Sequence, residues 1–219
     1  MKRAIKRAVL SCPEGRSIRF GIARGVRIHV DFQPRIRTYL GLYEVELNRY
    51  LRSLLKSGAP AFDVGARHGY DALVIAKHTR ARVASFERDP ACLRVMTDTL
   101  VLNPDLGPLI TPVEATVGNH DGQLGLDEYA YGMGFVPSFV KLDVEGGELA
   151  ALHSASRLLA ERHPSLIVEV HSAELEHDCG HLLIEHGYRP LVVNQRRVWP
   201  DHRPIGKVNR WLVAPAPTR

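Results

Sequence analysis

The sequence predicts a doubly wound, Rossmann-like α/β fold, in which a seven-stranded sheet follows an N-terminal β-hairpin and helix. From residue 61 onward, apolar segments of strand length alternate with helical patterns, which favours a parallel sheet covered on both faces. Ser165–Val170 is an apolar run, as expected for a strand buried on both faces. The expected strands are Ala61–Val64, Arg82–Glu87, Ile110–Val117, Ser138–Asp143, Ser165–Val170, Pro190–Val193 and Asn209–Val213.

Periodicity and end signals predict the helices. In Glu44–Lys56 four leucines recur on one helical face, and Ser57-Gly58-Ala59-Pro60 ends the pattern. Asp89 and Pro90 favour the N-cap and the first position of a helix that begins there. Gly125–Pro137 is expected to be a loop, long enough to act as a lid. The other expected helices are Gly69–Lys77, Gly147 to about Leu159 and Ala173–Glu185.

Two regions are expected: a basic extension over residues 1–40 and the main domain over residues 41–219. Ser17–Ile22 and Val26–Phe32 alternate apolar and polar residues around Arg24-Gly25, which predicts a small β-hairpin. Residues 1–37 contain ten Lys or Arg and two acidic residues, a net charge of +8, whereas the rest carries −3. Such an arm can bind nucleic acid, acidic lipid or an acidic partner, or it can be a solvated edge.

Composition limits the class of protein. At 219 residues, the chain has no apolar run of the roughly 20 residues that span a bilayer, and no export signal is expected. Cys12, Cys92 and Cys179 are too few and too scattered for a disulfide framework. We therefore expect reduced thiols and a cytoplasmic location.

The most informative segment is Asp63-Val64-Gly65-Ala66-Arg67-His68-Gly69-Tyr70, an apolar strand that ends in an acid and a glycine-bearing turn. Its D-x-G-x-x-x-G spacing differs from that of nicotinamide-binding and phosphate-binding loops, and it is typical of S-adenosylmethionine (SAM) methyltransferases. Gly65 and Gly69 permit close backbone approach to a ligand. Glu87 follows Asp63 by 24 residues, where a carboxylate can accept hydrogen bonds from ribose hydroxyls.

Ligands of open α/β sheets bind at the carboxyl ends of the strands, so these ends give the candidate site. Phe139 to Glu148 forms a second informative segment, in which three carboxylates follow an apolar strand within six residues. The expected strand ends are Asp63, Glu87, Glu114–Thr116, Asp143 and Glu169–His171.

Together these motifs resemble the FkbM-type SAM-dependent methyltransferase family over roughly residues 40–195. Lys141-Leu142-Asp143-Val144-Glu145-Gly146, with Glu148, is the most distinctive match. The other matching pieces, in family order, are Gly41-Leu42-Tyr43-Glu44, Asp63-Val64-Gly65-Ala66 with Gly69-Tyr70, Phe86-Glu87, Val117-Gly118, Asp121-Gly122, Leu126-Asp127 and Val168-Glu169-Val170-His171.

The resemblance implies a class I methyltransferase fold, SAM as cofactor and methylation of a hydroxyl on a sugar, polyketide or related small molecule. It departs from the family pattern at Arg67-His68, where the family usually has Asn and an apolar residue, and between Gly122 and Asp127, which is shorter than expected. No [DN]-P-P-[YF] block follows the fourth strand, which disfavours N-methylation. The expected cofactor-binding residues are Glu44, Asp63, Gly65, Ala66, Gly69, Tyr70, Glu87, Glu114, Ala115 and Asp143.

A hydroxyl becomes a good nucleophile only when a base or a metal ion takes up its proton. Asp143 and His171, at adjacent strand ends, are the candidate catalytic residues. With Glu169 they could instead hold a Mg²⁺-like ion, although no metal is predicted. His177, Cys179 and His181 lack the second cluster that a zinc site needs and are rejected as ligands.

Two other functions stay open. The chain could be an RNA methyltransferase that grips RNA with its basic arm, but it shows no RNA-binding module or aromatic platform, so nucleic acid is not the expected partner. It could also be a non-catalytic scaffold with a degenerate methyltransferase fold. The expected partner is a small-molecule acceptor, and the hairpin could pair with a second subunit to form a homodimer.

Overall fold

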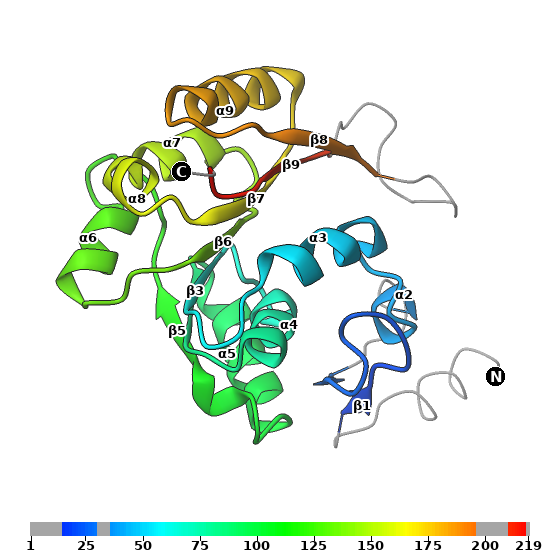
Figure 1. The fold of residues 1–219 in the computed structure, drawn as a ribbon. Helices are drawn as coiled ribbons and strands as arrows, with labels where there is room; N and C mark the ends of the chain where they lie inside the picture. The colour runs from blue at the N-terminus through cyan, green and yellow to red at the C-terminus, as the bar shows by residue number, and fades with distance from the viewer. Residues whose placement is uncertain (1–14, 30–35, 196–209, 218–219) are drawn as a thin grey trace.

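A computed structural model describes residues 15–29, 36–195 and 210–217 of the chain (Figure 1). The central sheet has seven strands in the order β5-β4-β3-β6-β7-β9-β8, which confirms the doubly wound, seven-stranded prediction. Neighbouring strands from β5 to β7 pair in parallel, and β9 runs antiparallel to both of its neighbours. The strands are β3 Ala61–Val64, β4 Val83–Glu87, β5 Ile110–Glu114, β6 Phe139–Leu142, β7 Ser165–Val170, β8 Leu191–Asn194 and β9 Arg210–Ala214.

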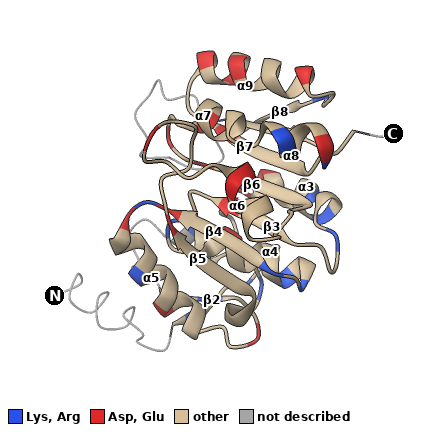
Figure 2. Ribbon diagram, turned by 90° about the vertical axis from the view of Figure 1, so that its left-hand side faces the viewer, with Lys and Arg blue, Asp and Glu red and all other residues tan. Residues whose placement is uncertain are grey.

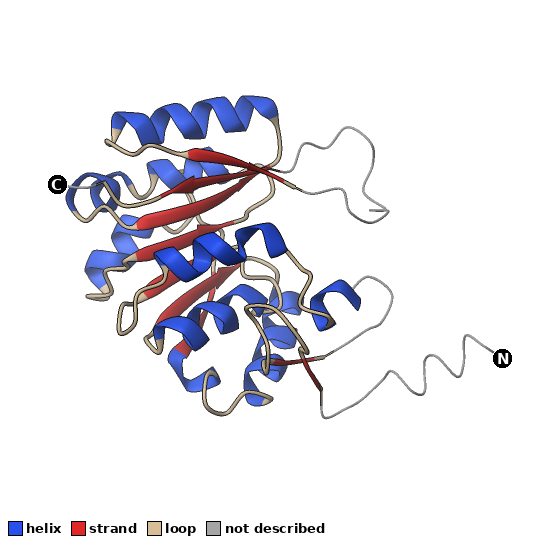
Figure 3. Ribbon diagram, turned by 45° about the vertical axis from the view of Figure 1, so that its right-hand side comes forward, coloured by secondary structure: helices blue, strands red, loops and turns tan. Residues whose placement is uncertain are grey.

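Helices cover both faces of the sheet (Figure 3). The first face packs against α3, α4 and α5 and the second against α6 to α9, so a separate apolar cluster forms on each side. The helices are α2 Ile36–Tyr39, η1 Val45–Leu47, α3 Asn48–Leu54, α4 Tyr70–Thr79, α5 Pro90–Val101, η2 Gly107–Leu109, α6 Leu126–Gly132, α7 Glu148–His153, α8 Ser156–Glu161 and α9 Ala173–Glu185.

The predicted hairpin is present but has shorter strands, β1 Arg16–Ser17 and β2 Arg27–Ile28. Residues 21–25 form its turn, and the remainder of the predicted second strand lies outside the described residues. Five apolar hairpin residues are buried in the same cluster as α4 and α5. Lys77 and His78 of α4 contact the Ile22 carbonyl oxygen, both at 3.1 Å, so the hairpin is fastened to the main domain.

The predicted loop over Gly125–Pro137 was wrong, because its first half is helix α6. Leu126 and Ala130 are buried on its inner side, and Tyr129 packs edge-on against the Phe86 ring at 4.9 Å. This segment therefore forms part of the second apolar layer rather than a lid.

The single helix predicted from Gly147 to Leu159 is two helices, α7 and α8. The chain breaks after His153, where the Ser154 hydroxyl oxygen accepts the amide of Leu126. Asp127 of α6 then caps α8, since its carboxylate accepts the amides of Arg157 and Leu158 at 2.7 and 2.9 Å. The apolar periodicity of residues 147–159 could not predict this break, because the residue that caps α8 lies 30 positions earlier in the chain.

Candidate active site

A cavity of about 460 Å³ opens at the carboxyl ends of β3, β4 and β6. This is where open α/β sheets bind ligands, because the strand order reverses between β3 and β6. Four of the predicted cofactor-binding residues line this cavity: Gly65, Glu87, Ala115 and Asp143. The other six, Glu44, Asp63, Ala66, Gly69, Tyr70 and Glu114, are not among its lining residues.

Glu87 is held rigidly at the end of β4. Its carboxylate accepts the backbone amide of Arg67 at 2.8 Å and that of Asp89 at 2.8 Å, one on each oxygen. Each carboxylate oxygen can accept more than one hydrogen bond, so Glu87 keeps acceptor capacity toward the cavity. The side chain is thus oriented in advance for a ligand with two donors.

Gly65 and Gly69, the two glycines of the Asp63–Tyr70 segment, have different structural roles. Gly65 has a φ of +84°, and a Cβ there would lie 1.7 Å from the carbonyl oxygen of Asp143, so this turn presses against the end of β6. Gly69 has a φ of +79° and begins α4, where a Cβ would lie 2.8 Å from Met96 Cγ. The amides of Gly65 and Ala66 both donate to the Phe86 carbonyl oxygen, so they hold the turn together rather than facing the cavity.

A buried lysine with several carboxylates lies beside this turn. The Nζ of Lys141 is 3.7 Å from Glu44 Oε2 and 3.9 Å from Asp71 Oδ2. Asp63 pairs in register with Lys141 across β3 and β6, and its Oδ2 atom is buried without a hydrogen-bond partner. Asp143 lies two residues after Lys141 in the chain, and the positive charge of Lys141 acts to lower the pKa of its carboxyl group.

Burial dominates the ionisation of these acids. Burial raises the pKa of Glu44 to about 8 and those of Asp63 and Asp71 to about 7, although Lys141 opposes the rise in each case. With pKa values of about 7 to 8 these three acids are partly protonated near neutral pH, so beside Lys141 the cluster carries little net charge and can ionise further when a cationic ligand group binds nearby. Asp71 did not emerge from the sequence, because an acid in the first turn of a helix is ordinary there.

The two predicted catalytic residues lie together. The His171 Nε2 atom is 3.5 Å from Asp143 Oδ1, and its Nδ1 atom is 2.6 Å from Glu148 Oε1. Glu148 is buried and accepts the amide of Gly146 with both carboxylate oxygens. The hydrogen bond to Glu148 raises the pKa of His171 above its ordinary value, and burial raises that of Asp143.

Glu169, together with Asp143 and His171, forms a group of side chains that could bind a metal ion. One ligand atom each from Asp143, Glu169 and His171 lie within 4.8 Å of one another. The second oxygen of Glu169 accepts the indole N–H of Trp211 at 3.2 Å, which fixes its orientation. Two carboxylates and one imidazole suit a Mg²⁺ or Mn²⁺ ion, so the metal alternative keeps a structural basis.

The rejected trio on α9 does not converge. Cys179 is fully buried, whereas the side chains of His177 and His181 are 78% and 65% exposed. Figure 2 shows acidic residues spaced along α9, and of these Glu174 and Glu185 are exposed, consistent with a solvated outer face.

Among the cavity residues, Arg88, Cys92 and Gln123 did not emerge from the sequence, because nothing in their local pattern marks a ligand-binding role. Arg88 precedes α5, Cys92 lies in its first turn and Gln123 lies in the segment after β5, whereas Thr116 belongs to an expected strand end. At the rim, the Arg67 guanidinium lies 3.9 Å from the Glu145 carboxylate, and both side chains are exposed. The unusual Arg67 is therefore paired across the cavity mouth.

Residues 134–190 match the family model of the methyltransferase FkbM domain. An FkbM methyltransferase from Methylobacillus flagellatus KT is similar in structure, with a TM-score of 0.59 and 21% identity over 74% of this chain. The match covers only 45% of that protein, so this chain spans less than half of its length. No curated protein matches the sequence.

Two other methyltransferases have similar structures. A precorrin-6y C5,15-methyltransferase from Geobacter metallireducens GS-15 has a TM-score of 0.56 and 16% identity, over 80% of this chain and 88% of its own. A SAM-dependent O-methyltransferase from Thermotoga maritima has a TM-score of 0.54 and 14% identity, over 78% of this chain and 64% of its own. At these identities the likeness shows the fold.

Among the described residues, no helix is long and apolar enough to cross a membrane. The chain has the class I methyltransferase fold, and its predicted resemblance to the FkbM-type methyltransferase family is confirmed.

Proposed function

We propose that this protein transfers a methyl group from SAM to a hydroxyl group of a small-molecule acceptor. The observation that carries this proposal is the chain of contacts Asp143–His171–Glu148, in which the first member lines the cavity. Proton uptake is what a hydroxyl acceptor needs from the protein, and these three side chains can provide it.

The residues present fit SAM. Glu87 offers a pre-oriented carboxylate for the ribose hydroxyls, and the small side chain of Ala115 lines the same cavity. A positively charged methionine end beside Glu44, Asp63 and Asp71 would favour their ionised forms, which are only partly populated near neutral pH. In this account Glu44 and Asp63 act on the cofactor through the electric field of the site, because neither lines the cavity.

Bound SAM supplies a methyl group that is already activated. An acceptor hydroxyl has to lose its proton when it is methylated, and in the proposed mechanism that proton would pass to Nε2 of His171. Asp143 orients the acceptor hydroxyl, since it lines the cavity and lies 3.5 Å from that nitrogen. Glu148 stabilises the resulting imidazolium through its contact with Nδ1.

Two alternatives give different outcomes. A divalent ion bound by Asp143, Glu169 and His171 would activate the acceptor hydroxyl in place of a general base. Activity would then depend on added metal. A non-catalytic scaffold with a degenerate methyltransferase fold would not need to bind a ligand in the cavity. The open cavity of about 460 Å³ and the paired Arg67 at its rim favour a working cofactor site.

The test is transfer of an isotopically labelled methyl group from SAM to a panel of hydroxylated acceptors. Each acceptor is paired with its O-methylated form and with an analogue that carries an amine in place of the hydroxyl. Label on the free hydroxyl compounds alone supports the proposal. Label on the amines, or on RNA but on no small molecule, would overturn it.

A further inference from the structure

One side of the molecule combines exposed apolar side chains with cations. The β1–β2 hairpin, α3 and β8 lie along this side, on the right in Figure 1. It carries five of the eight large hydrophobic residues that are exposed in the described part of the chain. These five are Phe20, Leu42, Val45, Leu191 and Val192, and Phe20 is the most exposed of them at 64%.

Phe20 and Leu42 are brought together by backbone contacts between their segments. Arg19 donates its amide to the Tyr39 carbonyl oxygen at 3.0 Å. A Cβ on Gly41 would lie 2.0 Å from the Phe20 carbonyl oxygen, so the hairpin turn and the segment before α3 are in direct contact. The two apolar side chains therefore belong to one continuous surface.

Cations gather beside them. Lys77 donates to the carbonyl oxygens of Ile22 and Arg24, at 3.1 and 2.6 Å, which places the hairpin turn on the end of α4. The pKa of Lys77 is lowered, most strongly by burial and next by the positive charges of Arg80, Arg24 and Arg52. No carboxylate contributes to this shift. The described carboxylates form no ion pair with these three arginines, so the group repels itself unless it meets an anion.

The same side has a groove of about 460 Å³ between α3 and β8. Val45 and Val192 give it apolar walls, while Arg49 and Arg52 line it with positive charge. The Arg49 guanidinium lies 4.4 Å from the centre of the Tyr50 ring. Glu46 is the single carboxylate among the groove's described lining residues.

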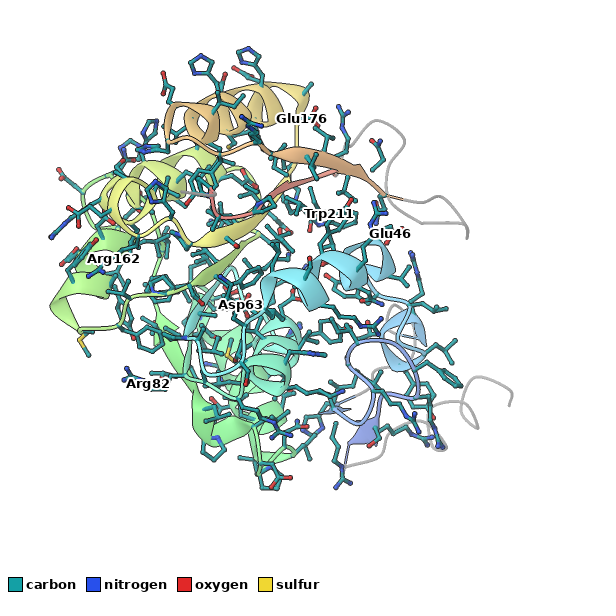
Figure 4. All side chains as sticks on the ribbon, viewed as in Figure 1. Glu46, Asp63, Arg82, Arg162, Glu176 and Trp211 are labelled. Atoms are coloured by element: carbon teal, nitrogen blue, oxygen red, sulfur yellow. The ribbon has the colours of Figure 1, made fainter. Side chains whose placement is uncertain are left out.

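We propose that this surface, the basic–apolar face, binds the surface of a membrane that contains anionic phospholipid. The face comprises Phe20, Leu42, Val45, Leu191 and Val192 together with Arg24, Arg49, Arg52, Lys77 and Arg80. Figure 4 shows the side chains of this part of the molecule, with Glu46 labelled at its edge. Cations attract the anionic headgroups, and apolar side chains between them enter the boundary between headgroups and acyl chains.

Membrane is favoured over nucleic acid by the kind of apolar residue present. Nucleic-acid surfaces place aromatic rings between their cations so that bases can stack on them. Four of the five exposed apolar residues on this face are aliphatic, and an aliphatic side chain gains little from a base. The aromatic ring in the groove, that of Tyr50, is already covered by the Arg49 guanidinium. Insertion into lipid, in contrast, uses aliphatic and aromatic side chains alike.

The test is co-sedimentation of the full chain with vesicles of phosphatidylcholine alone or of phosphatidylcholine mixed with phosphatidylserine. The face predicts binding to the mixed vesicles only, weakened by salt. Arg52→Glu combined with Arg80→Glu should lower vesicle affinity by at least about tenfold, because each surface cation contributes roughly fivefold. Phe20→Ser combined with Leu42→Ser should also weaken binding, although it changes no charge.

Arg94→Glu, an exposed change on α5, is the matched charge control and should lose less affinity than Arg52→Glu alone. All substituted positions are exposed, so circular dichroism should show unchanged folding. Failure of the wild type to bind mixed vesicles would overturn the proposal. Full binding by both double variants would do so as well, and so would RNA binding that depends on the arginines but not on Phe20 and Leu42.

Discussion

The Nδ1 atom of His171 lies 2.6 Å from Oε1 of Glu148, a buried carboxylate that is itself held by the amide of Gly146. This contact fixes the imidazole so that Nε2 faces Asp143. It also raises the pKa of His171, because a neighbouring carboxylate stabilises the charged ring. Neither His171 nor Glu148 is among the residues that line the cavity, so Asp143 is the member of this group that reaches it.

Glu148→Gln should lower the pKa of His171. The amide keeps the size of the side chain but removes the charge that stabilises the imidazolium, so burial then acts without opposition from this neighbour. The change is measured by NMR titration of the His171 ring. Glu174→Gln, an exposed change on α9, should leave this titration unaltered. An unchanged His171 titration in Glu148→Gln would contradict the assigned cause.

His171→Asn should reduce methyl transfer strongly while cofactor affinity stays close to that of the wild type. Loss of a positioned general base typically costs about 100-fold to 10,000-fold in rate. Because the neutral ring is the base, wild-type activity should rise with pH through the raised pKa of His171. A His171→Asn variant that reacts at the wild-type rate would exclude His171 as the base.

Chelation should leave activity intact. The proposed mechanism gives the acceptor proton to His171, so treatment with EDTA followed by gel filtration should not slow the reaction. Loss of activity that Mg²⁺ or Mn²⁺ restores would instead assign Asp143, Glu169 and His171 as metal ligands.

Gly65→Ala should destabilise the protein by more than about 1 kcal/mol, because it combines a positive φ with a clash at the Asp143 carbonyl oxygen. Gly132→Ala is the matched control, since Gly132 is helical and has open space around its Cβ position. That control should raise stability by about 0.5–1 kcal/mol. Urea unfolding measures both, and equal stability of the two variants would refute the argument.

Stability should fall as the pH rises from about 5 to about 8. Burial raises the pKa of Glu44 to about 8 and those of Asp63 and Asp71 to about 7, above their values in the unfolded chain. The folded protein then binds more protons than the unfolded chain in this range, so its stability is lost as these protons leave. The free energy of unfolding in urea at both pH values tests this, and a rise with pH would contradict it.

Much of the fold follows from the sequence, for a physical reason. Ala61–Val64 and Ser165–Val170 are strands at the predicted bounds, since their apolar runs leave them few alternatives to burial within the sheet. Helix α6 and the break after His153 were not predicted. Both depend on contacts between Asp127 and α8, about 30 residues away, which local periodicity cannot contain.

The candidate site was predictable to a smaller extent. Glu87 and Asp143 line the cavity because the carboxyl ends of parallel strands converge there. The position of Glu44 beside Lys141 depends on how the segment before α3 packs onto the sheet, and the sequence does not specify that packing. Asp71, which also lies beside Lys141, was missed because an acid in the first turn of a helix is ordinary.

The most direct test of the account is calorimetric titration with S-adenosylhomocysteine. Wild type, Glu87→Ala and the exposed control Asp98→Ala are compared, with folding checked by circular dichroism. We expect wild type and Asp98→Ala to bind S-adenosylhomocysteine with the same affinity. Glu87→Ala should lose most of its affinity, because the carboxylate that accepts the ribose hydroxyls is gone. A folded wild type that does not bind, or a Glu87→Ala variant that binds as tightly as the wild type, would contradict the cofactor site described here.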